Sequence, residues 1–133
     1  MTRDSILPPG ARTPLWREVT AGAEAGELRL QHCEDCGQVQ YPPREICGNC
    51  LSGRLQWRAT RPRGEVLSAT ALEASLEPFF RADLPVRLAL IRLEAGPVVY
   101  AFREVDLAEG QDVTVEARID AAGEAVLWAL ANR

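Results

Sequence analysis

The sequence predicts a mainly β protein with one short helix near the N-terminus, a small cysteine-rich ribbon of the rubredoxin-like type and a closed barrel of five strands. Three observations support this fold class. Apolar residues recur with a helical spacing only close to Trp16. All four cysteines fall between residues 33 and 50. From Leu55 onward, short runs that alternate apolar and polar residues are separated by turn residues, as expected for a small barrel.

Length and composition are those of an ordinary globular protein. The chain has 133 residues, of which 47% are hydrophobic and 26% are charged. This suits one domain, or one domain with a small metal-held appendage. No apolar run approaches the roughly 20 residues that a membrane-spanning helix needs, and the first residues lack the apolar core of a secretory signal. We therefore expect a cytoplasmic protein.

The N-terminal segment, residues 1–26, is expected to be a mobile arm followed by a helix. Thr13 and Pro14 form a typical helix start, with threonine as the N-cap and proline at the first helical position. A helix this short is not stable alone, so its apolar face must be buried. Trp16 packs either on this protein's own ribbon or on a partner protein, and the sequence leaves both readings open. The apolar face comprises Leu15, Trp16 and Val19.

Residues 27–57 carry the cysteine motif. Cys33 and Cys36 form one pair with two residues between them, and Cys47 and Cys50 form a second pair ten residues later. Each pair bends the chain into a knuckle that directs two sulfurs to one point, so the two knuckles supply the tetrahedral thiolate shell of a closed Zn²⁺ site. No position is left for water or substrate. We expect one structural zinc ion per chain, without a catalytic role.

Three other roles are open to the cysteines. Two disulfides would require an oxidising compartment. A redox pair would leave the second pair unexplained. Iron also suits four cysteines, and the sequence does not decide between zinc and iron. The spacing of two within each pair favours a metal over disulfides.

Short alternating runs surround the knuckles. One run enters the first knuckle, one leaves it, and one follows the second knuckle. This is the layout of a zinc ribbon, which is too small for a core of its own and depends on the metal for folding energy. The alternating apolar residues are Leu28 and Leu30, then Val39 and Tyr41, then Leu55 and Trp57.

Residues 58–133 are expected to form the barrel, and an OB-like barrel of five strands matches the pattern best. Counting from Leu55, before the start of this range, gives five or six strands, with runs of strand character at 55–60, 65–73, 86–93, 98–102, 113–119 and 126–130. A change of phase between Leu90 and Ile91 suggests a β-bulge, and residues 74–85 read as an irregular segment. We expect Trp128→Ala to unfold or nearly unfold the chain. The predicted core comprises Val66, Leu88, Leu90, Val98 or its neighbours, Val113, Val115 and Trp128.

The residues for independent catalysis are missing. All fifteen basic residues are arginine, which excludes lysine chemistry. The single histidine, His32, adjoins Cys33 and is expected at the edge of the ribbon. No nucleotide-binding, serine-hydrolase or zinc-protease motif occurs. We therefore expect no catalytic residue and no enzyme activity of the isolated chain.

Two clusters are candidates for binding. Arginines at four positions near the start of the barrel either form a solvated face or bind phosphate groups through guanidinium forks. Two adjacent phenylalanines lie in the irregular segment, where apolar anchors suit a protein interface together with Trp16. The arginines are Arg54, Arg58, Arg61 and Arg63, with Arg44 on the ribbon loop near them, and the phenylalanines are Phe79 and Phe80.

Several of these runs together resemble a known family, the zinc-ribbon/OB-fold proteins called "domain of unknown function 35". The resemblance covers about residues 14–130 and is more specific than the cysteines alone. The chain departs from the family in Arg61-Pro62-Arg63, where many members have a serine–glycine turn, and in lacking histidine between residues 73 and 80. The matching runs are 30–37, Tyr41-Pro42-Pro43-Arg44, 47–50, 55–57, 64–68, 89–97 and 109–113.

The resemblance implies an accessory subunit. Such proteins associate with thiolase-like enzymes, including lipid-transfer-type thiolases and aldolases that act on long or steroid-like acyl-CoA. The barrel would hold or border the CoA, and the partner would carry out catalysis. On this reading the arginine cluster contacts CoA phosphates, and the chain functions in a hetero-oligomer. No catalytic residue is transferred to this sequence.

A nucleic-acid-binding module is the alternative, because ribbons and OB barrels both bind nucleic acids. It predicts a basic groove with stacking aromatic residues. Residues 65–133 instead carry six arginines against twelve acidic residues. We also expect Tyr100, Phe102 and Trp128 to face the core. Both points favour the accessory subunit.

Overall fold

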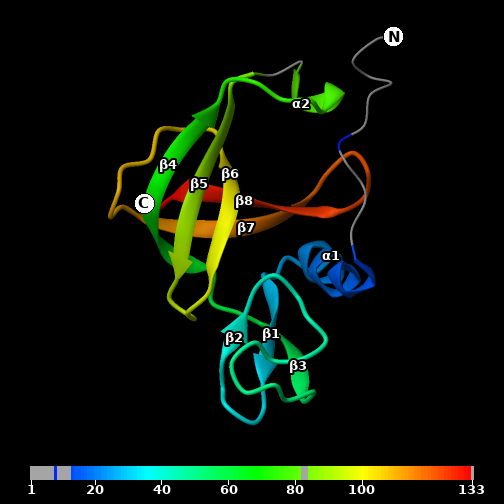
Figure 1. Cartoon of the computed structure of the whole chain (residues 1–133). Helices are drawn as coiled ribbons and strands as arrows, with labels where there is room; N and C mark the ends of the chain where they lie inside the picture. The colour runs from blue at the N-terminus through cyan, green and yellow to red at the C-terminus, as the bar shows by residue number, and fades with distance from the viewer. Residues whose placement is uncertain (1–7, 9–12, 82–83, 133) are drawn as a thin grey trace.

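The computed structural model describes Pro8 and residues 13–81 and 84–132. Most of the predicted N-terminal arm lies outside these described residues. Figure 1 shows a barrel above a smaller ribbon, with helix α1 beside the region where the two meet. The fold class is therefore confirmed: mainly β, with a short N-terminal helix, a ribbon and a closed barrel. In the described part of the chain, no helix is long and apolar enough to cross a membrane.

The N-terminal helix begins where the sequence predicts. A 3₁₀ turn, Pro14–Trp16, leads into α1, Arg17–Glu24. The carbonyl of Thr13 accepts a hydrogen bond from the N–H of Trp16 at 2.9 Å, but the threonine side chain makes no capping hydrogen bond. The expected N-cap is thus right in position, while its side-chain contact is not formed.

The ribbon is a three-stranded antiparallel sheet. Its strands are β1 (Arg29–Cys33), β2 (Val39–Gln40) and β3 (Leu55–Ala59), in the order β2-β1-β3. β1 and β2 flank the first knuckle, and β3 follows the second, as predicted. Because β1 lies in the centre, β2 is an edge strand.

The barrel closes in the order β4-β5-β6-β8-β7. All neighbouring pairs are antiparallel except β6 and β8, which are parallel. This is OB topology. A short helix, α2 (Pro78–Arg81), lies in the predicted irregular segment. The barrel strands are β4 (Arg63–Leu72), β5 (Val86–Leu93), β6 (Val98–Arg103), β7 (Asp112–Ile119) and β8 (Ala125–Ala131).

The interior of the barrel differs in part from the predicted core. Val66, Val113 and Val115 are buried as expected, and on β6 Val99, a neighbour of Val98, is buried. The predicted core positions of Leu88, Leu90 and Trp128 are wrong, because these residues lie half-buried on the outer face of the barrel. The inward positions beside them hold small or medium residues, because the interior of a five-stranded barrel is narrow. These inward residues are Ala89, Ile91, Leu93, Ala101, Leu127 and Ala129.

The position of the bulge is also corrected. The register shift lies in β4, between Val66 and Ser68, and not in β5. β5 is regular, with Ala89, Ile91 and Leu93 inward. The apparent phase change arose because apolar residues occupy both faces of this strand.

One core extends from the barrel into the ribbon. Leu28 and Leu30 belong to the same buried cluster as Val66 and Ile91 of the barrel, and Tyr41 packs against it. Thr20 of α1 accepts a hydrogen bond from the N–H of Ala125 at 3.1 Å. The ribbon, the helix and the barrel are therefore held together by shared packing.

Candidate functional site

The four cysteines converge as the sequence predicts. Their sulfur atoms all lie within 4.8 Å of one another. The Sγ atoms of Cys33 and Cys50 are 3.5 Å apart, and those of Cys36 and Cys47 are 3.6 Å apart. These separations far exceed a disulfide bond of about 2.05 Å, and all four thiols are unbridged. They are close to the roughly 3.8 Å between sulfurs in a tetrahedral shell with metal–sulfur bonds of about 2.3 Å.

Backbone N–H groups point at the sulfurs. The N–H of Cys36 donates to the Sγ of Cys33 at 3.5 Å, and the N–H of Asn49 donates to the Sγ of Cys47 at 3.4 Å. Such bonds favour the thiolate. The Asn49 side chain and then the Gln38 N–H lower the pKa of Cys36 to about 6. The thiolate that a metal requires is therefore favoured at Cys36, whereas the pKa of Cys50 is raised to about 12, so these two thiols differ before a metal binds.

Two buried glutamines hold the loop between the knuckles, and the sequence analysis missed them. The side-chain amide of Gln31 bonds both the N–H and the carbonyl of Arg44. Gln40 donates to Gln31 at 3.0 Å and accepts from the N–H of Gly48 at 3.0 Å. The network ties the second knuckle to β1 and β2. Glutamines in short strands are usually exposed to solvent, so the sequence carries no sign that these two are buried and hydrogen-bonded to the loop.

His32 has a structural contact. Its Nε2 lies 2.8 Å from the Oγ1 of Thr60, at the start of the barrel segment. Burial, followed by the charge of Arg58, lowers the pKa of His32 below its ordinary value. The histidine therefore connects β1 to the chain that enters the barrel.

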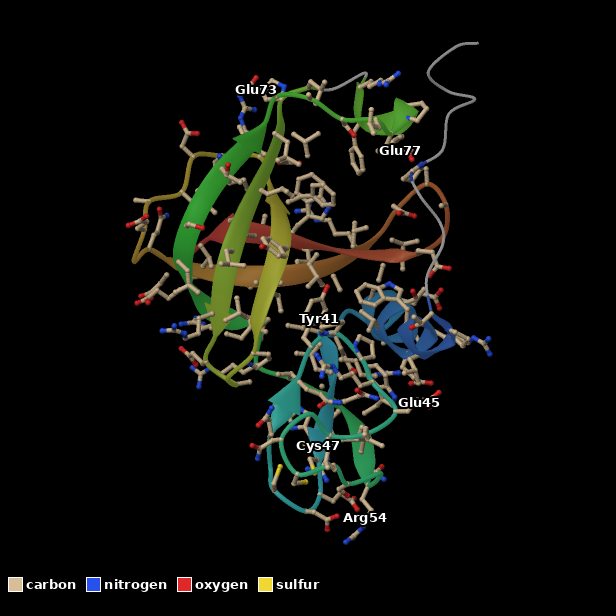
Figure 2. All side chains as sticks on the ribbon, viewed as in Figure 1. Tyr41, Glu45, Cys47, Arg54, Glu73 and Glu77 are labelled. Atoms are coloured by element: carbon tan, nitrogen blue, oxygen red, sulfur yellow. The ribbon has the colours of Figure 1, made fainter. Side chains whose placement is uncertain are left out.

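The four arginines divide between ribbon and barrel. Arg54 lies at the end of the ribbon farthest from the barrel (Figure 2) and forms ion pairs with Glu34 and Asp35. Arg58 approaches Glu34 at 3.9 Å, whereas Arg61 pairs with Glu94 at 3.2 Å. Arg63 is on β4, opposite Thr114 of β7. These contacts distribute the arginines over two surfaces, and their role in phosphate binding stays a prediction.

Trp16 lies at the junction of the ribbon and the barrel. Its Nε1 donates to the carbonyl of Ala125 on β8 at 3.0 Å, and its ring meets that of Tyr41 edge-on at 5.9 Å. The tryptophan is half-buried. It therefore packs on this protein's own ribbon and barrel, while a role in partner binding stays a prediction.

Aromatic rings form a continuous row on the outside of the barrel. Phe79 contacts Phe80, Phe80 contacts Phe102, and Phe102 contacts Trp128, with centroid separations between 5.3 and 5.9 Å. The guanidinium of Arg118 lies 4.9 Å from the Trp128 ring centroid. We call Phe79, Phe80, Phe102 and Trp128 the aromatic row. The expectation that Phe102 and Trp128 face the core is wrong.

Tyr100 extends this apolar surface. It stands on β6 next to the row, and 67% of it is exposed, so its predicted core position is also wrong. A shallow hollow of about 210 Å³ adjoins it, with Trp16, Tyr41 and Leu88 among its walls. The sequence shows that β6 is apolar on both faces, since Val98, Tyr100 and Phe102 alternate with Val99 and Ala101. This pattern indicates an apolar outer surface, but it does not show which of the two faces lies inside the barrel.

Two family models match the chain. The ChsH2 rubredoxin-like zinc ribbon domain matches residues 20–56, and the ChsH2 C-terminal OB-fold domain matches residues 57–126. Among solved structures, one described as an Ltp2-ChsH2(DUF35) aldolase is 19% identical, with a TM-score of 0.74 over 92% of this chain and 97% of that one.

A second structure is a DUF35-family protein of unknown function from Sulfolobus solfataricus. It is 18% identical, with a TM-score of 0.62 over 90% of this chain and 87% of that one. Both likenesses concern the fold. Because the two family models follow one another along most of the sequence, this chain belongs to the ChsH2 family of DUF35 zinc-ribbon/OB-fold proteins.

Proposed function

We propose that this chain is a non-catalytic accessory subunit that binds a thiolase-like enzyme and helps to hold its acyl-CoA substrate. The family supports this, as does the likeness to a structure whose description pairs Ltp2 with ChsH2 in an aldolase. The observation that carries the proposal is the aromatic surface outside the barrel. An exposed tyrosine beside a row of packed rings is typical of a protein interface.

The metal in this proposal is zinc. Four thiolates in a tetrahedral arrangement suit a closed zinc site, and such a site supplies folding energy instead of catalysis. Elemental analysis of native protein should give one zinc per chain. Less than about half an equivalent of metal would contradict a structural site, and iron in its place would contradict zinc.

The proposed interface is tested by affinity purification from the native host. Tyr100→Asp places a charge on the exposed part of this surface, and Leu51→Asp is a matched control on the ribbon, where Leu51 is 72% exposed. We expect wild type and the control to recover a thiolase-like protein, and Tyr100→Asp to recover at least about tenfold less. Phe79→Ala/Phe80→Ala should also weaken the complex. Equal recovery with all variants would contradict the assignment of the surface.

The acyl-CoA role is tested on the reconstituted complex. Arg58→Glu/Arg61→Glu should weaken use of acyl-CoA while the complex stays intact, if these guanidinium groups contact the phosphates of CoA. Turnover by the isolated chain would contradict an accessory role. Wild-type behaviour of the double variant would assign both arginines to ordinary surface.

Nucleic-acid binding remains a second candidate, because the aromatic residues face outward after all. Tyr100 is exposed, and Arg118 stacks on Trp128. Against it stands the excess of acidic residues from residue 65 onward. Binding of single-stranded DNA by the isolated chain, with a steep salt dependence that Tyr100→Ala abolishes, would favour this function over the accessory subunit.

A further inference from the structure

A cleft between the ribbon and the barrel adjoins the metal site at Cys36 and contains no residue of the aromatic row. Its volume is about 690 Å³. The ribbon wall is formed by the first knuckle and β2, residues 36–41, together with Arg44, Gly48 and Asn49. The barrel wall is formed by residues 95–98, which comprise the turn after β5 and the first residue of β6. Figure 1 shows this turn directly above β2. The volume falls within the range of about 300–1,000 Å³ typical of ligand sites.

Arg44 gives the cleft its charge. It is the one lysine, arginine, aspartate or glutamate among the lining residues. Its guanidinium lies near Gly48, where an added Cβ would stand 3.1 Å from Nη1. In the ion pairs of residues 13–81 and 84–132, Arg44 takes no part, unlike Arg54 and Arg61. Its positive charge therefore faces the cleft without a carboxylate from the described chain.

The position of Arg44 is fixed by buried contacts. Gln31 is 3% exposed, and its side-chain amide bonds both backbone groups of Arg44 at 2.8 Å. The loop holds its backbone in one place before any ligand arrives, which reduces the ordering cost of binding.

β2 offers a free strand edge to the same cleft. The N–H of Cys33 donates to the carbonyl of Gln38, and Gln40 is the register partner of Gln31. Successive residues of a strand direct their peptide groups to opposite sides, so those of Val39 point away from β1. Among the described residues, β1 is the one strand that pairs with β2, and the loop and turn hydrogen bonds do not involve Val39. An unpaired N–H and an unpaired carbonyl thus belong to a residue that lines the same cleft as Arg44.

We propose that this cleft binds an extended, acidic peptide segment of the partner subunit. The segment pairs with the backbone of Val39, as in strand addition at a sheet edge, and places a carboxylate on the guanidinium of Arg44. A phosphate or other small anion would satisfy Arg44 but leave the Val39 carbonyl unpaired, which favours a peptide. The identity of the partner rests on the proposed function, whereas the peptide site is a property of this chain alone.

The test is an NMR titration of the full chain with metal bound. The probes are acetyl-Val-Glu-Val-amide and, as a control of opposite charge, acetyl-Val-Lys-Val-amide, each at about 10 mM, which saturates a site with a Kd of about 1 mM. We expect the glutamate peptide to shift the Val39 amide and the Arg44 Nε–H signals, and the lysine peptide to shift neither.

Two variants distinguish a specific effect of the Arg44 guanidinium from a general effect of the protein's charge. Arg44→Gln should weaken binding of the glutamate peptide by about tenfold or more, since hydrogen bonds to charged groups contribute that much. Arg87→Gln, which removes the same charge at the far end of β5, should leave the affinity unchanged. Equal affinity in Arg44→Gln and wild type would overturn the proposal.

Three further results would also overturn it. The first is that neither signal shifts with the glutamate peptide. The second is that glutarate and inorganic phosphate shift the Arg44 signal as strongly as the peptide does while the Val39 signal is unchanged, which would make this a small-anion site. The third is that the Arg44→Gln variant loses its metal, which would assign the arginine to the thiolate centre. The Tyr100→Asp variant should lose the partner enzyme but still bind the peptide. This result would show that the aromatic surface and the cleft are tested independently of each other.

Discussion

The side-chain amide of Gln31 forms with the backbone of Arg44 the two hydrogen bonds that a neighbouring strand would otherwise provide. Its Nε2 donates to the Arg44 carbonyl and its Oε1 accepts from the Arg44 N–H, both at 2.8 Å. The loop from Tyr41 to Cys47 is too irregular to pair with β1 through its own backbone. One buried amide therefore fixes the loop that carries both the second knuckle and the wall of the cleft.

Gln31→Leu should destabilise the ribbon. The leucine has a similar volume but leaves the N–H and carbonyl of Arg44 without partners, which costs about 1–3 kcal/mol. Chemical denaturation with metal bound measures the loss, and chelator competition should show faster release of metal. Gln56→Leu, at an exposed position of the neighbouring strand β3, should stay within about 0.5 kcal/mol of wild type. Equal stability of the two variants would show that the loop does not depend on Gln31.

Acid should release the metal and with it the fold of the ribbon. The thiolate binds the metal, and the pKa of Cys36 is lowered to about 6 from an ordinary 9.0. Stabilisation by the thiolate is thus full above the ordinary pKa of 9.0, declines as the pH falls, and is lost at about pH 6 and below, where protons compete for sulfur. A pH series with a zinc-sensitive dye follows the release. Full retention of metal at pH 3 would contradict thiolate ligation.

Cys36→Ser should disorder residues 28–57 and weaken the barrel as well. The shared core is the reason, because Leu28 and Leu30 lie in the same buried cluster as Val66 and Ile91. Loss of the metal therefore removes packing from the barrel wall. Amide spectra of the variant should lose the ribbon signals, and its barrel should melt at a lower temperature than wild type. An unchanged barrel melting temperature would show that the two parts are energetically independent.

Trp128→Ala should leave the chain folded, which reverses the expectation from the sequence. Trp128 lies half-buried on the outer face, against Phe102 and Arg118. Leu127 points inward and is 3% exposed. Leu127→Ala should therefore cost about 2–5 kcal/mol, and Trp128→Ala clearly less. Denaturant unfolding of both variants decides the order, and a larger loss for the tryptophan would place it in the core.

Gly64→Ala should destabilise the barrel where β4 pairs with both β5 and β7. A Cβ at this position would lie 2.5 Å from the carbonyl oxygen of Arg92, which belongs to the backbone and cannot move aside cheaply. Such overpacking costs about 1–3 kcal/mol. Gly53→Ala is the control, because its Cβ would meet no atom within 4 Å. Similar melting temperatures for the two variants would contradict the close approach of β4 and β5.

The sequence by itself determined the features that depend on local spacing. The two cysteine pairs predicted the convergence of Cys33, Cys36, Cys47 and Cys50, since a knuckle is built from adjacent residues. Pro14 located the start of the N-terminal helix, and the turn residues separated the barrel strands. The family resemblance rested on the same runs.

Only the tertiary structure decided which face of each barrel strand is inward. Leu88, Phe102 and Trp128 are larger and more apolar than Ala89, Ala101 and Ala129, yet the alanines fill the interior. A closed five-stranded barrel has a narrow interior that small residues fill, while α1, α2 and the aromatic row cover parts of its outer face. Apolar residues therefore occur on both faces of the strands, and hydrophobicity alone does not show which face is inward. The contact of Gln31 with Arg44 likewise depends on a loop that folds back on β1, and no sequence period marks such a pair.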